Sequence, residues 1–357
     1  MRYQRQIILK GFGIEKQQLL QKSKVLVIGA GGLGCPVLMY LAAAGIGHLG
    51  IVDYDTVENT NLNRQILYTP NDVGLKKVMV SAKKIKAFNP EIEVEIYDSL
   101  LDNNLAWKLI QVYDVIVDCT DTFTTRYLIN DACVLLNKPW VFGAIFSMQG
   151  QVAAFNVSGE KHKTNYRHFF AKPPLPDNIQ NCETAGVLGT MPGIIGLMQA
   201  EQVIKICAQL PGVLHNRINY YNSVNNSWQL FELSEIPQIN TPKSKEAFLN
   251  FNYGQFCNEL IAPLITYDNL NLNQQTLIDV RNKNEKPYLN CKHFHIPLET
   301  LPEKLKSMKL NDIVFVCNTG MRSKQAAQLA VNLGINAFSL QNGLTFNQQL
   351  TITDGAQ

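Results

Sequence analysis

Short apolar stretches alternate with longer amphipathic segments from residue 24 to about residue 155. The short stretches predict strands, and the longer segments predict helices. We expect strands at 25–29, 49–53, 92–97, 114–118, 139–143 and 150–157, and helices at 33–44, 73–88, 102–110 and 123–137. This alternation predicts an α/β fold, a Rossmann-like doubly wound and mostly parallel sheet with helices on both faces.

The pattern changes after residue 157. Three prolines predict an extended loop over 172–182, and Pro192 is placed to open a helix over 192–208. Two apolar stretches predict a hairpin of strands at 217–222 and 227–233. A second alternation begins near residue 264, with expected strands at 276–280, 313–317 and 336–340 and a helix at 322–333. We therefore predict a domain over 1–236, a linker over 237–262 and a small α/β domain over 263–357.

Composition fits this two-domain interpretation. The chain has 357 residues, of which 46% are hydrophobic and 17% charged, enough for a sizeable core. Its net charge of +3 is too small to indicate nucleic acid or a membrane surface as the partner. We find no apolar run of membrane-spanning length and no signal-peptide pattern at the start, so we expect a cytoplasmic protein. The eight cysteines contain no Cys-x-x-Cys pair, which argues against a disulfide framework.

A glycine-rich turn follows the first predicted strand. Gly29, Gly31, Gly32 and Gly34 span the change from that strand to the predicted helix at 33–44. Glycines let the backbone approach a phosphate, and a helix amino terminus directs N–H groups at the anion. Asp53 ends the next strand, where an acceptor for a ribose hydroxyl is expected. Taken alone, these features are typical of a dinucleotide-dependent dehydrogenase.

Further polar residues follow the carboxyl ends of the predicted strands, where a doubly wound sheet binds its ligands. They are Asp53, Asp55, Asn61, Arg64, Lys76, Lys77, Asp118 and Asp121. Cationic side chains offset charge on phosphoryl groups, and a carboxylate can hold Mg²⁺. This set suits a magnesium-bound triphosphate, and hydride transfer would not need it.

Six motifs then give a specific resemblance. In chain order they are Arg5-Gln6-Ile7-Ile8-Leu9, Gly29-Ala30-Gly31-Gly32-Leu33-Gly34, Asp53-Tyr54-Asp55-Thr56-Val57, Asn61-Leu62-Asn63-Arg64-Gln65, Asp118-Cys119-Thr120-Asp121 and Cys182-Glu183-Thr184-Ala185-Gly186-Val187. In this order they resemble the MoeB/ThiF family, bacterial relatives of ubiquitin-activating enzymes, over roughly residues 1–235. The resemblance implies an ATP-dependent adenylyltransferase that acts on the Gly-Gly carboxylate of a ubiquitin-like sulfur carrier protein.

The same resemblance implies roles for individual residues. Gly29, Gly31 and Gly32 bind the nucleotide, with Gly32 approaching the phosphates, and Asp53 holds the ribose. Asn61, Arg64 and Lys77 contact the phosphates, and Asp121 ligates Mg²⁺. Arg5 reaches into the partner subunit's site, which makes a homodimer the active form. Cys182 matches a cysteine that can bond covalently to the carrier.

Several of these residues have plainer interpretations. Cys182 can be an ordinary loop thiol, Arg5 can pair with a surface carboxylate, and Asp55 can be a turn or cap residue. Lys76 is interpreted as a solvated helix residue, and Arg126 either stabilises a helix or contacts the adenylate. The family commonly carries zinc on two Cys-x-x-Cys pairs, but the first pair matches Asn165-Tyr166-Arg167-His168 here. We therefore predict no structural zinc site.

A cysteine ends an apolar strand in the second predicted domain. Cys317 is followed by a glycine-containing turn, by Arg322 and by a predicted helix. Loop N–H groups, the helix dipole and Arg322 should favour an anionic, nucleophilic sulfur. With Leu277-Ile278-Asp279-Val280-Arg281, His295-Ile296-Pro297-Leu298 and Asn342-Gly343-Leu344, this loop resembles the rhodanese-like sulfurtransferases over about 264–350. The resemblance implies a persulfide on Cys317; an inactive, purely structural module is the alternative.

The two halves predict one pathway. An acyl-adenylate needs a nucleophile and a persulfide supplies sulfur, so the carrier's carboxylate would become a thiocarboxylate, with Cys182 as a candidate for a transient acyl disulfide. Molybdenum-cofactor carriers (MoaD-like) are the favoured clients, thiamine carriers (ThiS-like) the close alternative, and a cysteine desulfurase a possible persulfide donor. An NAD-dependent oxidoreductase and a non-catalytic scaffold for a ubiquitin-like partner remain as hypotheses of other classes.

Overall fold

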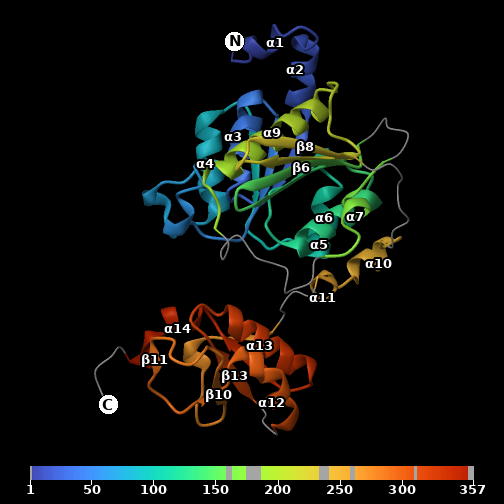
Figure 1. Ribbon diagram of the computed structural model, residues 1–357. Helices are drawn as coiled ribbons and strands as arrows, with labels where there is room; N and C mark the ends of the chain where they lie inside the picture. The colour runs from blue at the N-terminus through green and yellow to red at the C-terminus, as the bar shows by residue number, and fades with distance from the viewer. Residues whose placement is uncertain are drawn as a thin grey trace. The chain divides into compact units, whose positions relative to one another are not determined.

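The computed structural model describes residues 2–157, 163–173, 186–232, 241–257, 262–308 and 312–352. It divides into two compact units, Met1–Cys257 and Asn258–Gln357, each drawn in Figure 1. Within the described ranges, no helix is both long enough and apolar enough to span a bilayer.

The first unit is built on an eight-stranded sheet in the order β3-β2-β1-β4-β5-β6-β7-β8. Strands β3 to β5 of this order run parallel, and β5 to β8 run antiparallel. The strands are β1 (Lys24–Ile28), β2 (His48–Val52), β3 (Glu93–Tyr97), β4 (Val115–Asp118), β5 (Trp140–Phe146), β6 (Gln149–Phe155), β7 (Arg217–Asn222) and β8 (Ser227–Glu232). The predicted doubly wound, mostly parallel sheet is confirmed.

Helices cover both faces of this sheet (Figure 1). They are α1 (Gln4–Ile7), α2 (Gly13–Lys22), α3 (Gly34–Ala44), α4 (Lys77–Phe88), α5 (Asn103–Ile110), α6 (Phe123–Leu135), α7 (Tyr166–Phe169), α9 (Thr190–Cys207), α10 (Lys245–Leu249) and α11 (Tyr253–Phe256). Strand β1 shows why two layers form. Val25 and Val27 point into the core under α3, α4 and α9, whereas Leu26 and Ile28 point into the core under α5 and α6. An apolar run without alternation therefore buries both faces of a parallel strand.

The strand order reverses between β1 and β4, which are neighbours although β2 and β3 intervene in sequence. A crevice for ligands forms at such a switch point, beyond the carboxyl ends of the strands. Gly29 follows β1 there, Asp53 follows β2, and Asp118 ends β4. The topology thus brings the predicted nucleotide-binding motifs to one edge of the sheet.

The structure differs from the predicted linker over 237–262. Helices α10 and α11 lie within that range, and both pack on the first unit. Phe248 is fully buried and packs against Trp107 with the rings tilted by 44°, and its carbonyl accepts a 2.7 Å hydrogen bond from Asn103 Nδ2. Tyr253 donates from its hydroxyl to Asp131 Oδ2 at 2.9 Å. Aromatic burial therefore extends the first unit to residue 257.

The second unit contains a five-stranded parallel sheet in the order β12-β10-β13-β14-β9 and a separate β11-β15 pair. Its strands are β9 (Leu264–Ile265), β10 (Thr276–Asp279), β11 (Tyr288–Leu289), β12 (Phe294–His295), β13 (Ile313–Val316), β14 (Ala337–Leu340) and β15 (Thr351–Ile352). Its helices are α12 (Leu301–Ser307), α13 (Met321–Asn332) and α14 (Gly343–Phe346). The predicted small α/β unit is confirmed, with β13 central and α13 directly after it.

Candidate active sites

The glycine-rich turn between β1 and α3 contains glycines of two kinds. Gly29 has φ +94°, and a Cβ there would lie 2.6 Å from the carbonyl oxygen of Cys119. A Cβ on Gly34 would lie 2.1 Å from the Gly29 carbonyl oxygen. The fold itself requires these two glycines, because the turn packs directly on β4 and on itself. At Gly31 a Cβ would make only an ordinary 3.6 Å contact with Gln65 Nε2, and at Gly32 it would press on Pro192 at 3.1 Å.

Asp53 ties this turn to the end of β2. Its Oδ2 accepts a 2.7 Å hydrogen bond from the Ala30 N–H, and its Oδ1 accepts one of 2.8 Å from the Asp55 N–H. Burial raises the pKa of Asp53, and these two hydrogen bonds act in the opposite direction. Each carboxylate oxygen keeps a second lone pair, so the residue predicted to hold a ribose can still accept from a hydroxyl.

The predicted phosphate-binding cations lie in different surroundings. Lys77, at the start of α4, is only 6% exposed, and its Nζ lies 2.9 Å from Asp55 Oδ2. Asp55 is thus the partner of Lys77, a role that neither the turn nor the cap interpretation anticipated. Lys76 points elsewhere, with its Nζ 3.0 Å from Asp98 Oδ1. Arg64 is half-buried and donates to the Thr60 carbonyl at 2.8 Å, while Asn61 is buried beside the same segment.

The loop after β4 is organised by a buried carboxylate. Asp118 Oδ1 accepts hydrogen bonds from the Thr120 N–H at 2.9 Å and from the Thr120 hydroxyl at 2.7 Å. Its Oδ2 is buried 3.7 Å from Arg126 Nε, and neither atom has a hydrogen bond within the described structure. Burial raises the pKa of Asp118 to about 6. Asp121, three residues on, is exposed, and none of the described residues pairs with its carboxylate.

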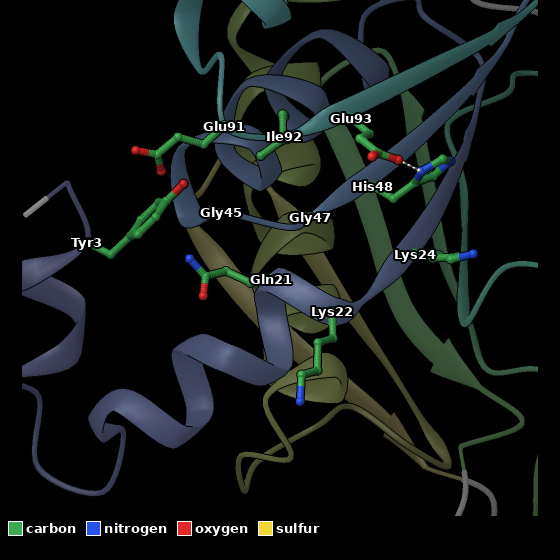
Figure 2. A pocket seen from close by; sticks show the side chains of 10 residues that line it. All are labelled: Tyr3, Gln21, Lys22, Lys24, Gly45, Gly47, His48, Glu91, Ile92 and Glu93. Carbon is green, nitrogen blue, oxygen red and sulfur yellow. Dashed lines mark hydrogen bonds and ion pairs between the residues drawn. The ribbon is translucent and has the colours of Figure 1, made fainter.

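Arg5 is not brought to the glycine-rich turn of its own subunit. Helix α1 packs at the carboxyl end of α3, where Gln6 Nε2 donates to the Ala44 carbonyl at 3.2 Å. The turn lies at the other end of α3, about 16 Å away for a helix of 11 residues. Figure 2 shows the hollow beside α1, of about 330 Å³, lined by Tyr3, Gly45, Gly47 and His48. This hollow is therefore separate from the predicted nucleotide site.

Two further sequence predictions concern Cys182 and the segment 165–168. Cys182 lies outside the described residues. Where the resemblance aligned a zinc-binding cysteine pair, the Asn165 N–H instead donates to His168 Nδ1 at 3.0 Å. Between them, Arg167 is buried and donates from Nε and Nη2 to Asp131 at 2.8 and 2.7 Å. A buried ion pair thus fixes this segment, and no cluster of three or more potential metal-binding side chains occurs in the described ranges.

The cysteine loop of the second unit surrounds one sulfur atom. Cys317, at the end of β13, is 1% exposed. Its Sγ accepts from the Gly320 N–H at 3.2 Å and from the Ser323 N–H at 3.4 Å. Gly343 allows this packing, since a Cβ there would lie 2.6 Å from the Cys317 carbonyl oxygen. The loop is a cradle for a negatively charged sulfur at the amino end of α13.

Arg322 is held by a residue that the sequence analysis missed. Its Nη1 and Nη2 donate to Oε1 and Oε2 of Glu285, each at 2.6 Å. Hydrogen bonds from Arg322 lower the pKa of Glu285 to about 2. Glu285 lies four residues after the Asp279-Val280-Arg281 motif, and it is the only acidic residue of the polar run 282–286, which is the one signal that the sequence offered.

Comparisons with known proteins agree with this division. The ThiF family model matches residues 3–241, and the rhodanese-like domain model matches residues 264–345. The chain is 39% identical to the probable molybdopterin-synthase adenylyltransferase of Porphyra purpurea, covering 90% of this chain and 86% of that protein. It is 34% identical to the probable adenylyltransferase/sulfurtransferase MoeZ of Mycobacterium tuberculosis, covering 96% and 91%.

A third relative is longer. The adenylyltransferase and sulfurtransferase MOCS3 of Anopheles gambiae is 43% identical over 72% of this chain, but the match spans only 58% of that protein's length. Among solved structures, Escherichia coli MccB with AMPCPP and MccA has the same fold, with a TM-score of 0.60 at 23% identity over 68% of this chain and 74% of that chain. The chain belongs to the ThiF family, with a rhodanese-like domain following its ThiF region.

Proposed function

We propose that this protein adenylates the Gly-Gly carboxylate of a ubiquitin-like sulfur carrier and then converts it to a thiocarboxylate, with a MoaD-like carrier of molybdenum cofactor biosynthesis as the client. One observation carries the proposal. A glycine-rich turn at a sheet switch point and a cysteine held by loop N–H groups occur in one chain. The glycine-rich turn suits a ligand with phosphate groups, and the cysteine loop suits a sulfur anion. The names of the relatives from Porphyra purpurea and Mycobacterium tuberculosis support the same pairing.

Adenylation would use the edge formed by β1, β2 and β4. The amino end of α3 and the turn at Gly31 and Gly32 would face the phosphates of ATP, with Asp53 at the ribose. Lys77 and Arg64 would offset the phosphate charge, and Asn61 would donate from its amide to a phosphate oxygen. The carrier's carboxylate attacks the α-phosphorus, the bond to the β-phosphate oxygen breaks, and pyrophosphate leaves with that electron pair. An acyl-adenylate results.

Asp121 fits the expected Mg²⁺ ion. Magnesium in such sites takes one or two carboxylates and completes its shell with phosphate oxygens and water. Asp121 is an exposed carboxylate without a partner in the described structure, two residues after Cys119, whose carbonyl lies beside Gly29 of the turn. When bound, the ion would neutralise negative charge on the triphosphate.

Sulfur transfer would begin at Cys317. The terminal sulfur of a persulfide attacks the acyl carbon, the carbon–oxygen bond to AMP breaks, and an acyl disulfide forms. Its enzyme sulfur belongs to Cys317 or, after persulfide exchange, to Cys182. A second thiolate attacks that enzyme sulfur, the sulfur–sulfur bond breaks, and the carrier leaves as a thiocarboxylate. An external thiol reduces the remaining disulfide.

Intact-mass spectrometry tests the proposal. A MoaD-like and a ThiS-like carrier would each be incubated with the protein, Mg-ATP and a persulfide donor. We expect the MoaD-like carrier to gain the mass of one sulfur in exchange for one oxygen, and a Cys317→Ala variant to leave it unmodified. Modification of the ThiS-like carrier alone would transfer the proposal to thiamine biosynthesis. No modification and no ATP consumption would favour the scaffold or oxidoreductase hypothesis.

We further propose that the active form is a homodimer in which Arg5 acts in the partner subunit's site. The position of α1, at the end of α3 remote from the turn, supports this arrangement. Mixing Arg5→Ala with Lys77→Met subunits would generate heterodimers with one intact site. We expect the mixture to recover ATP–pyrophosphate exchange activity. If the mixture stays inactive, Arg5 does not act in the partner subunit's site.

A further inference from the structure

The two arginines that contact the Cys317 loop are both neutralised. Arg281 is buried, and its Nη2 lies 2.7 Å from Asp279 Oδ2, while its Nη1 donates to Asn318 Oδ1 at 2.8 Å. Arg322 pairs through both terminal nitrogens with Glu285. Each cation therefore has its own carboxylate, and the arginines give the loop no net positive charge.

Glu285 is built into this arrangement. Its Oε1 also accepts a 2.8 Å hydrogen bond from the Asn282 N–H, and its Oε2 lies 3.4 Å from Asn318 Nδ2. The side chains of Arg322 and Glu285 are 33% and 27% exposed, so the pair lies at the mouth of the loop. Because Arg322 holds the pKa of Glu285 at about 2, the carboxylate is ionised throughout the neutral range.

The charge state of the loop matters for the sulfur donor. A doubly negative donor such as thiosulfate needs an uncommitted cation beside the attacking sulfur. A persulfide can instead react as its neutral hydropersulfide, R–S–SH, whereas thiosulfate stays a dianion at neutral pH. Among the described residues, the hydrogen-bond partners of the Cys317 sulfur are neutral groups of its own loop: the Gly320 N–H, the Ser323 N–H and, at 3.6 Å, the Ser323 hydroxyl. A free anion must therefore compete with Glu285 for Arg322.

We propose that Glu285 is a specificity-determining residue that selects persulfide donors and rejects thiosulfate. This inference rests on the proposed sulfurtransferase function and adds the residue that discriminates between donors. With a persulfide, the Cys317 thiolate attacks the terminal sulfur, the sulfur–sulfur bond breaks, and the donor leaves as a thiolate with the electron pair. With thiosulfate the same attack would release sulfite, and the approach of that dianion is what Glu285 opposes.

The test compares two donors on the full-length protein. Persulfide formation on Cys317 would be followed by mass spectrometry with thiosulfate and with cysteine persulfide, and kcat/KM would be obtained for each. Glu285→Gln keeps the size of the side chain and removes its charge. Glu303→Gln is the matched control, because Glu303 is an exposed glutamate on α12 with no hydrogen bond or ion pair to the described residues.

We expect Glu285→Gln to raise the ratio of thiosulfate to cysteine persulfide kcat/KM by about tenfold or more. Glu303→Gln should leave the ratio unchanged. An unchanged or lower ratio in Glu285→Gln, including an equal loss with both donors, would overturn the inference and leave Glu285 a structural residue. If the wild-type protein accepts sulfur from neither donor, the sulfurtransferase half of the proposed function is refuted instead. The wild-type measurement alone decides this, so the two failures can be told apart.

Discussion

The two candidate sites are built on the same supersecondary element, but the ligands proposed for them differ in size. In each, a buried parallel strand ends in a glycine-containing turn that opens a helix: β1 leads to α3, and β13 leads to α13. At the second, two N–H groups already point at the Cys317 sulfur. At the first, the buried cation Lys77 is paired with a carboxylate, Asp55.

The difference follows from the size of the ligand each site is proposed to hold. One sulfur atom can be enclosed by the backbone of a single loop, so most of its contacts come from residues 317–323. A triphosphate spreads its charge over many oxygens, so its partners must come from several strand ends. Asp53 and Lys77 come from the connection between β2 and β3, and Asp121 follows β4. Local sequence therefore specifies the second site more completely than the first.

The largest expected effect separates the two sites completely. Cys317→Ala should abolish persulfide formation, on the order of a thousandfold or more, and leave ATP–pyrophosphate exchange intact. Asp121→Asn should do the reverse, because it removes the carboxylate proposed for Mg²⁺. The two reactions would be measured separately on each variant. Loss of both reactions in either variant would mean that the sites are coupled, contrary to the comparison.

The next effect distinguishes glycines that the fold needs from a glycine that a ligand needs. Gly29→Ala should destabilise the first unit by about 2–5 kcal/mol, because of its positive φ and its approach to the Cys119 carbonyl oxygen. Gly31→Ala should leave stability nearly unchanged and weaken ATP binding. Urea unfolding can be followed by fluorescence, since Trp107, Trp140 and Trp228 all lie in the first unit. Normal ATP affinity in Gly31→Ala would show that the turn does not approach the nucleotide there.

The sequence predicted the frame of both sites better than their charge pairs. The apolar stretches before Gly29 and Cys317 predicted β1 and β13 closely, because a buried parallel strand is apolar on both faces. The Lys77–Asp55 and Arg322–Glu285 pairs join residues 22 and 37 positions apart, and only the folded chain brings them together. The sequence therefore identified Lys77 and Arg322 as candidate site residues but did not predict which carboxylates pair with them.

Two of the departures in secondary structure have clear physical causes. A helix over 73–88 was predicted, but α4 begins at Lys77. Gly74 has φ +85°, and Lys76 forms an isolated bridge with Thr56, so tertiary pairing overrides the helical spacing of Val73 and Leu75. Helices α10 and α11 were taken for a linker because each is short, and their stability comes from aromatic burial against α5 and α6.

A smaller effect depends on pH and concerns the buried carboxylate of the first site. Burial raises the pKa of Asp118 to about 6, so the folded state binds more protons than the unfolded state between about pH 4 and pH 6. Stability from this group is present at low pH and is lost as pH rises through that range. Relative to wild type, Asp118→Asn should therefore gain up to about 3 kcal/mol between pH 4 and pH 7. Parallel curves for the two proteins in urea unfolding would contradict this assignment.

The smallest effect tests whether the lysine that is buried and paired with Asp55 in the structure is the functional lysine of the first site. Lys77 and Lys76 are adjacent and alike in sequence, yet the Lys77 side chain is 7% exposed and that of Lys76 is 43% exposed. Lys77→Met should lower ATP–pyrophosphate exchange by about a hundredfold, the usual cost of losing one preorganised group that stabilises phosphoryl charge. Lys76→Met, the matched control, should change exchange less than about twofold, as expected for an exposed ion pair. If the two variants behave alike, burial beside Asp55 has no bearing on catalysis, and the first site would depend on backbone N–H groups as much as the second does.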